Sequence, residues 1–157
     1  MSKIEARLQA LGVSLPKPVA AVANYVPAVK VGALLVVSGQ LPFGPEGKLD
    51  PRHTGKLSDG HPIDAAKEAA KLCAINILAQ ARAALGDLDR IRSVVRLGGF
   101  FNVASAFQGL PQAMNGASDL MAEAFGEAGR HARTTVGVTH LPLNALAEVE
   151  AMFEIAP

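Results

Sequence analysis

The sequence predicts an α+β fold, a two-layer sandwich in which a mixed β-sheet carries two helices on one face. Short Val-rich segments alternate with two long Ala- and Leu-rich segments in the order ββ, α, β, α, ββ. The last segment, 147–155, alternates apolar and polar residues, so we expect one sheet face to meet the helices and the other to stay bare. Because the chain has 157 residues, half of them hydrophobic, it is long enough for one core and too short for two domains.

The first 18 residues are expected to form a helical arm attached to a domain of residues 19–157. Ser2 can cap a short amphipathic helix over 3–11, and Gly12 can end it. Two strands follow, over 20–31 and 33–38, joined by a tight turn. Residues 41–61 are rich in proline and glycine and therefore predict a long surface loop.

Glycines mark the ends or irregular points of the remaining elements. Asp64 is expected to cap the first long helix, which Gly86 ends. The Gly98–Gly99 pair predicts a bulge or bend in the third strand, and Gly116 weakens the second long helix. The predicted elements are helices at 65–85 and 110–125 and strands at 90–101, 134–138 and 147–155.

Composition excludes several kinds of partner and site. A net charge of +1 gives no overall preference for nucleic acid or an anionic membrane. Cys73 is the only cysteine, which excludes an internal disulfide and fits a reducing cytoplasm; its place in an apolar helix stripe indicates core packing. The four histidines lack zinc-like spacing, so we expect no metal. We expect no signal peptide and no membrane span, because no stretch is apolar enough.

The segment "GRHARTTVGV" (129–138) is the strongest candidate for chemistry. If it is a strand, Arg133, Thr135 and Gly137 point one way while Thr134, Val136 and Val138 point into the core. Glu148 and Glu150 lie on the polar face of the last strand. If the two strands pair, Arg133 and Glu148 face one shallow space.

Two interpretations of that pair remain open. Arg133 can bind a ligand carboxylate with its planar donors while Glu148 holds or activates a water molecule. Alternatively, both are surface charges in a cross-strand ion pair, which contributes about 0–1 kcal/mol. His131 could assist as a base, although a histidine before a strand is usually a loop or capping residue.

Two longer stretches carry a family resemblance. "NYVPAVKVGALLVVSGQLP" (24–42) and "HARTTVGVTHLPLNALAEVEAMFEI" (131–155) resemble the RidA/YjgF/UK114 family, also labelled endoribonuclease L-PSP, in a longer and less characterised branch. The likeness covers roughly residues 25–155. It implies a chorismate-mutase-like fold assembled as a homotrimer, in which the sheets form a central barrel and ligand pockets lie in the clefts between subunits.

The resemblance also implies an activity and a set of residues. Better-known members hydrolyse reactive enamines and imines, such as 2-aminoacrylate, to 2-oxo acids and ammonia without a cofactor. By position, Arg133 resembles the carboxylate-binding arginine and Glu148 the water-positioning glutamate. The matched pocket residues are Tyr25, Ser38, Gly39, more weakly Asn102, and Thr135, which stands where many members have a cysteine.

Three functions therefore stay open at the level of sequence. The first is imine or enamine hydrolysis. The second is a regulatory protein that binds a small carboxylate without turnover. The third is an endoribonuclease or translation inhibitor, against which the near-zero net charge, the single tyrosine and the absence of tryptophan argue.

Overall fold

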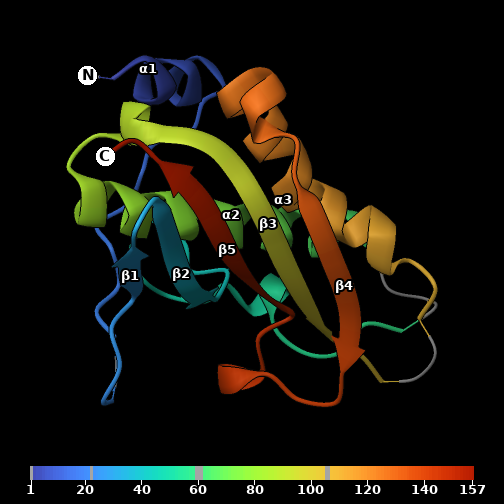
Figure 1. The fold of residues 1–157 in the computed structure, drawn as a ribbon. Coiled ribbons are helices and arrows are strands. Elements are labelled where there is room, and N and C mark those ends of the chain that lie inside the picture. Colours follow the sequence, from blue (N-terminus) through green and yellow to red (C-terminus); the bar gives the residue numbers. More distant parts are fainter. Residues whose placement is uncertain (1, 22, 59–61, 105–106) are drawn as a thin grey trace.

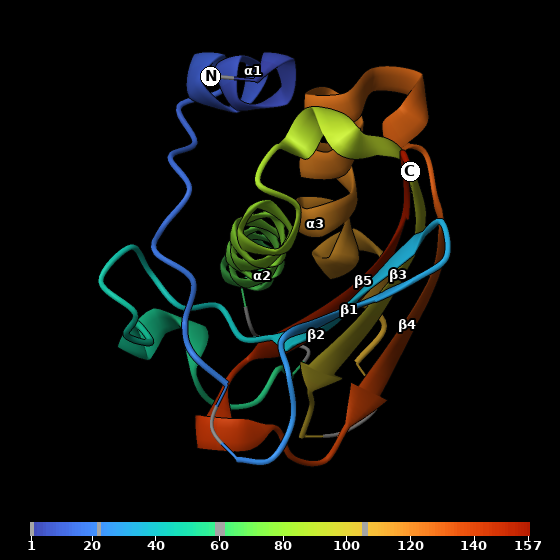
Figure 2. The same ribbon diagram turned by 60° about the vertical axis from the view of Figure 1, so that its left-hand side comes forward.

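One mixed sheet with helices on one side forms the body of the protein, as expected (Figure 1). The computed structural model describes residues 2–21, 23–58, 62–104 and 107–157. Five strands lie in the order β1-β2-β5-β3-β4. Figure 2 shows α2 and α3 on the same side of this sheet, with α1 beyond them. The elements are α1 (Lys3–Ala10), β1 (Ala28–Val31), β2 (Leu34–Gln40), α2 (Ile63–Leu85), β3 (Ile91–Asn102), α3 (Leu110–Phe125), β4 (Ala132–Val138) and β5 (Ala147–Ile155).

The predicted opening hairpin is present, with different bounds. β1 and β2 pair antiparallel around Gly32. The first strand begins only at Ala28, not at residue 20, and Pro27 immediately before it has no N–H to donate to a ladder. β2 continues two residues past its predicted end, to Gln40.

The two long helices pack closely because small residues face one another. The predicted cap of α2 was wrong: Pro62 is the N-cap and Asp64 lies in the first turn, while Gly86 ends the helix as expected, with φ 79°. α3 has exactly the predicted bounds. A Cβ at Gly116 would overlap the carbonyl oxygen of Lys67, so this glycine marks the point where the two helix backbones meet.

β5 and β3 form the centre of the sheet. β5 alternates as predicted: Val149, Ala151 and Phe153 are buried under the helices. A bulge or bend was predicted at Gly98–Gly99; there is no bulge, because both glycines pair in regular register with β5. The register shifts lie earlier, between Ile91 and Ser93 and between Val94 and Arg96.

β4 overturns the predicted placement of the arginine. It pairs in parallel with β3 at the edge of the sheet, so β3 separates it from β5 and the two strands do not pair. Arg133 lies opposite Leu97, which is fully buried under the helices. Because opposed residues project from the same face, Arg133, Thr135 and Gly137 face the helices. The bare face therefore takes Thr134, Val136 and Val138, the reverse of the prediction.

Both ends of the described chain are fixed at one short helical turn, Leu88–Arg90. The backbone N–H groups of Lys3 and Ile4 donate to the carboxylate of Asp89, and that of Ala156 donates to the carbonyl of Arg90. Ser2 caps α1 as predicted, in a capping box with Glu5. In the described part of the chain, no helix is long and apolar enough to cross a membrane.

Candidate functional site

A cavity of about 400 Å³ lies between β2, β5 and the segment that precedes β1. It brings together three of the predicted site residues, Tyr25, Gly39 and Glu148. The Tyr25 side is open, since that residue is 54% exposed. The predicted Ser38 lies next to Gly39, and its hydroxyl donates to the carbonyl of Val26 at 3.0 Å, which ties the segment carrying Tyr25 to β2.

Glu148 is the charged group of this cavity. Burial raises the pKa of its carboxyl above the usual value, and the nearby Glu150 carboxylate raises it further. A Cβ at position 39 would lie only 3.0 Å from Cδ of Glu148, so the carboxylate occupies space that only a glycine leaves open. The acid therefore retains a proton more readily than an exposed glutamate does.

Two buried amides support the cavity wall and were not predicted. Gln40 donates to the carbonyl of Ser38 at 3.0 Å. Gln80 donates to the carbonyl of Val19 at 2.7 Å and to Oε1 of Gln40 at 3.4 Å. A polar residue in the apolar stripe of the long helix was the available signal for Gln80, because buried amides are retained where they have partners.

Asn102 is not among the residues that line the cavity. Its side chain is fully buried, accepts from Nζ of Lys56 at 2.8 Å and donates to Oδ1 of Asn144 at 3.1 Å. Asn144 and the cavity-lining Leu143 both have positive φ, 54° and 55°, which is costly for residues other than glycine. The asparagine thus supports a turn that closes one side of the cavity.

Arg133 is held at a second location, against α3. Its Nη1 donates to Oδ1 of Asn115 at 2.8 Å and to Oγ of Ser118 at 3.1 Å, and its Nη2 donates to the carbonyl of Pro111 at 3.3 Å. A guanidinium has five N–H donors. Among the described residues, these three bonds leave the Nε–H and one hydrogen of Nη2 for a ligand.

The partners of Arg133 were missed from the sequence. Asn115 and Ser118 are polar residues three positions apart in α3 and therefore lie on one side of this helix, and this spacing was the available signal. His131, considered above as a base, contacts Ser118: Nε2 lies 2.9 Å from Oγ, and Nδ1 lies 2.6 Å from the carbonyl of Gly129.

Thr135 projects from the same face of β4, two residues beyond Arg133. Its hydroxyl oxygen is buried and has no hydrogen-bond partner among the described residues. A buried hydroxyl without a partner is costly to the folded chain.

The two halves of the predicted site are therefore apart in one chain. Arg133 and Thr135 face the helices, whereas Glu148, opposite Phe100, projects from the bare side of the sheet. Arg133 is not among the described residues that line the cavity of Glu148. One copy of the chain thus presents a carboxylate-binding half and a glutamate-bearing half in different places.

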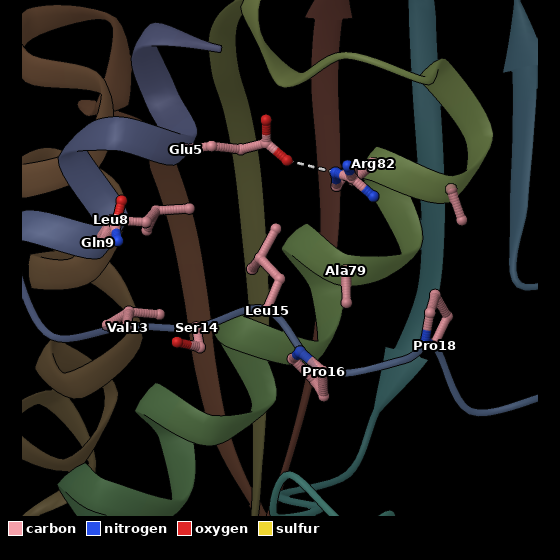
Figure 3. Close-up of a pocket in the computed structure, with 11 residues that line it drawn as sticks. Glu5, Leu8, Gln9, Val13, Ser14, Leu15, Pro16, Pro18, Ala79 and Arg82 are labelled. Atoms are coloured by element: carbon pink, nitrogen blue, oxygen red, sulfur yellow. Dashed lines mark hydrogen bonds and ion pairs between the residues drawn. The ribbon is translucent and has the colours of Figure 1, made fainter. Parts of the chain in front are cut away.

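A larger cavity, of about 590 Å³, lies beneath α1 (Figure 3). It is lined by α1, the segment from Val13 to Pro18 and α2, and the Glu5–Arg82 ion pair crosses it. Among the described residues that line it there is no predicted site residue, and the one cation, Arg82, is already paired with Glu5. We therefore take the smaller cavity, with its perturbed carboxyl, as the candidate site.

The described residues offer no group of three or more His, Cys, Asp or Glu side chains that could hold a metal ion. Of the four histidines, His61 lies outside the described residues. Cys73 is buried in the core, and burial raises the pKa of its thiol well above the usual value, as expected for a packing residue.

Comparison with known proteins gives one consistent family. Residues 5–155 match the family described as "YjgF/chorismate mutase-like, putative endoribonuclease". Protein TCP17 of Trypanosoma cruzi is 44% identical over 98% of this chain and 94% of its own length. The crystal structure of Atu1372 from Agrobacterium tumefaciens, a protein of unknown function, is 47% identical, with a TM-score of 0.89 over 98% of this chain and 93% of that one. E. coli TdcF with bound serine shares the fold at 21% identity, with a TM-score of 0.65 over 89% of this chain and 94% of its own.

Proposed function

The chain belongs to the YjgF/chorismate mutase-like family, and on that premise we propose that it hydrolyses small carboxylate-bearing enamines and imines, of the 2-aminoacrylate type, to 2-oxo acids and ammonia. The proposal includes no cofactor, no metal and a cytoplasmic location. Arg133 and Glu148 are the proposed catalytic residues, and Tyr25, Ser38, Gly39 and Thr135 are the proposed substrate-binding residues, with Asn102 supporting the turn beside them.

The observation that carries the proposal is the hydrogen bonding of Arg133. Three contacts to α3 hold the guanidinium, and the donors left over lie on Nε and Nη2, a pair that can bind both oxygens of one carboxylate. Since the arginine is already ordered, little side-chain entropy is lost when a ligand binds. A small organic acid is the ligand that this arrangement fits.

Glu148 supplies the acid–base group. An enamine substrate first gains a proton at its terminal carbon and becomes the imine. In its carboxylate form Glu148 accepts a proton from water as the water oxygen attacks the imine carbon, and it passes this proton to the nitrogen, which gives a carbinolamine. It then moves the hydroxyl proton to the nitrogen in the same way, so that the C–N bond breaks and ammonia leaves as the 2-oxo acid forms. Its raised pKa brings the group closer to neutral pH, where proton transfer in both directions is efficient. The nearby phenol of Tyr25 and the backbone of Gly39 bound the space in which this reaction would take place.

A second copy of the chain would join the two halves. The bare face of the sheet exposes large apolar side chains, including Val29, Val31, Leu34 and Val136, which is unusual for a face left in water. We propose a homotrimer in which this face is covered and Arg133 of one subunit meets Glu148 of the next. The carboxylate and the imine carbon of one substrate would then lie between subunits.

The test is ammonia and 2-oxo acid release from 2-aminoacrylate generated in the assay. Arg133→Ala should lower kcat/KM by about 100-fold or more, as expected when a charged hydrogen-bond pair is lost. Arg130→Ala is the matched control, because Arg130 is three residues away, is exposed and pairs only with Glu127 among the described residues. Equal rates for wild type and Arg133→Ala would refute the mechanism.

Subunit mixing tests the shared site. Arg133→Ala and Glu148→Gln are each expected to be inactive alone. Trimers formed by refolding the two variants together would contain clefts with both native residues and should regain part of the wild-type rate. If the mixture stays inactive while wild-type chains refolded in the same way recover activity, the two residues do not act across subunits.

The second candidate is binding without turnover. It is favoured by the bound serine in TdcF, because serine carries a carboxylate group, as the proposed substrates do. Thermal stabilisation by 2-oxo acids or serine, together with no product from 2-aminoacrylate, would select this function over hydrolysis. RNA cleavage, which the family description names, ranks third. The net charge of this chain is only +1, whereas nucleic-acid-binding proteins usually carry a strongly basic surface.

A further inference from the structure

A chain of three hydrogen bonds leads from the backbone of η3 (Gly126–Gly129) to Arg133. Nδ1 of His131 lies 2.6 Å from the carbonyl oxygen of Gly129, Nε2 of His131 lies 2.9 Å from Oγ of Ser118, and that Oγ accepts from Nη1 of Arg133 at 3.1 Å. His131 lies immediately before β4, Ser118 lies in the middle of α3, and Arg133 lies in β4.

The direction of each bond follows from what its members can donate. A carbonyl oxygen only accepts, so Nδ1 of His131 carries the proton. In the neutral ring Nε2 then has a lone pair and accepts the hydroxyl hydrogen of Ser118. Because that hydroxyl has only one hydrogen, its lone pairs are left to face the guanidinium.

We infer that His131 and Ser118 are positioning residues for Arg133: the histidine orients the serine hydroxyl, and the serine holds Nη1 so that the Nε and Nη2 donors stay turned toward the ligand. The inference rests on the proposed function of Arg133 and adds two residues to that site. It also assigns His131 a role other than that of a catalytic base.

Asn115 alone does not fix the same orientation. Its Oδ1 accepts one hydrogen of Nη1, and Pro111 accepts one from Nη2, so loss of the Ser118 bond leaves the guanidinium able to turn about these two contacts. A serine without the histidine can donate instead to a carbonyl of its own helix, which is the common alternative for helical serines. Both losses should loosen Arg133 without removing its charge.

The experiment uses the full-length ¹⁵N-labelled protein and needs no turnover. The Arg133 side-chain signal is assigned from its absence in Arg133→Lys, and the rotation rate of the guanidinium is measured by exchange of its Nη hydrogens. Binding is measured by titrating pyruvate and following the Arg133 Nε signal. The variants are Ser118→Ala and His131→Ala, with Ser118→Thr and His131→Gln as conservative replacements.

Both alanine variants should speed guanidinium rotation and weaken pyruvate binding by about ten-fold, the size expected for one hydrogen bond to a charged group. Ser118→Thr keeps a hydroxyl and His131→Gln offers an oxygen to Ser118, so both should restore most of the wild-type behaviour. Ser93→Ala and His140→Ala are controls, because Ser93 pairs with Glu154 and His140 is exposed beyond β4. The controls should match wild type.

Two results would overturn the inference: wild-type rotation and binding in the alanine variants, or conservative variants as impaired as the alanine ones. Failure of the proposed function would look different, since wild type would release no ammonia from 2-aminoacrylate whatever the rotation rates. If hydrolysis is found, the alanine variants should raise KM about ten-fold and leave kcat within about two-fold, because Arg133 binds the carboxylate before and during reaction.

Discussion

Gly39 and Glu148 share one space: the carboxylate of the glutamate fills the position that a side chain at residue 39 would need. Gly39→Ala should therefore displace Glu148 and lower kcat by about 100-fold, the scale of losing a positioned acid–base group. It should also reduce the free energy of unfolding by about 1–3 kcal/mol, as overpacking does. Rates and urea unfolding curves of the purified variant measure both effects.

Gly44→Ala is the control for this prediction. A Cβ at Gly44 would lie 3.6 Å from the carbonyl oxygen of Lys48, an ordinary contact. Its rate should match that of wild type. A Gly39→Ala protein with the wild-type rate would show that the place of the Glu148 carboxylate does not matter for activity.

The pH profile should report the pair Glu148–Glu150. Glu150→Gln removes the negative charge that helps to raise the pKa of Glu148, so the acid limb of kcat/KM should move to lower pH. Arg96 loses its carboxylate partner at 3.2 Å, and its freed charge acts in the same direction. The pKa of Glu148 should stay above its usual value in this variant, because burial is the larger cause of the increase. Glu154→Gln, farther along the same strand, should leave the limb unchanged; movement toward higher pH in Glu150→Gln would contradict the assignment.

Stability should depend on pH through the same carboxyl. A raised pKa in the folded state means that ionised Glu148 costs stability above that pKa, and the cost disappears as the pH falls below the ordinary value of 4.5. Glu148→Gln should thus unfold at higher urea than wild type at pH 7, and the difference should vanish near pH 4. A larger difference in acid than at neutral pH would mean that the carboxylate is stabilised, not strained.

Thr135→Val tests the buried hydroxyl. Because Oγ1 has no partner among the described residues, replacing it with a methyl group should raise the free energy of unfolding by about 1 kcal/mol. The same change should raise KM for the substrate several-fold if the hydroxyl serves the ligand. Thr134→Val, on the bare face, is the neighbouring control. Destabilisation in Thr135→Val would reveal a protein partner for the hydroxyl.

Asn102→Ala should act through the turn at Leu143. The substitution removes two hydrogen bonds from a fully buried site and leaves Lys56 with one fewer acceptor, which should cost about 2–4 kcal/mol. Asn102→Asp keeps the acceptor for Lys56 and should recover part of the stability. Thermal unfolding measures both; an alanine variant as stable as wild type would remove the proposed support of the turn.

Local patterns predicted most of the fold. The bounds of α3 and β5 were correct because capping glycines and strict alternation are properties of short windows. The orientation of β4 was wrong for a physical reason. Alternation separates Arg133 from Thr134 but cannot tell which faces the helices, since most residues of this edge strand are exposed. That assignment depends on pairing with β3, whose residues lie 36 positions before their β4 partners in the sequence.

The site was predicted only in part, because sequence motifs identify single residues but not the contacts between distant elements. Tyr25, Gly39 and Glu148 were recognised from family motifs, and the structure brings them to one cavity. The hydrogen-bond partners of Arg133 were not recognised, because Asn115, Ser118 and His131 acquire meaning only when α3 lies beside β4. The proposed joint action of Arg133 and Glu148 requires two copies of the chain, and local patterns in one sequence carry no information about that contact.

Both chain ends are bound by neighbouring residues, Asp89 and Arg90, at the end of the molecule remote from the Leu143 turn (Figure 1). A short linker could therefore join them without crossing the sheet. A surface tether attached at either of these positions would lie away from the Leu143 side of the cavity of Glu148. Immobilised forms of the protein are thus compatible with its architecture.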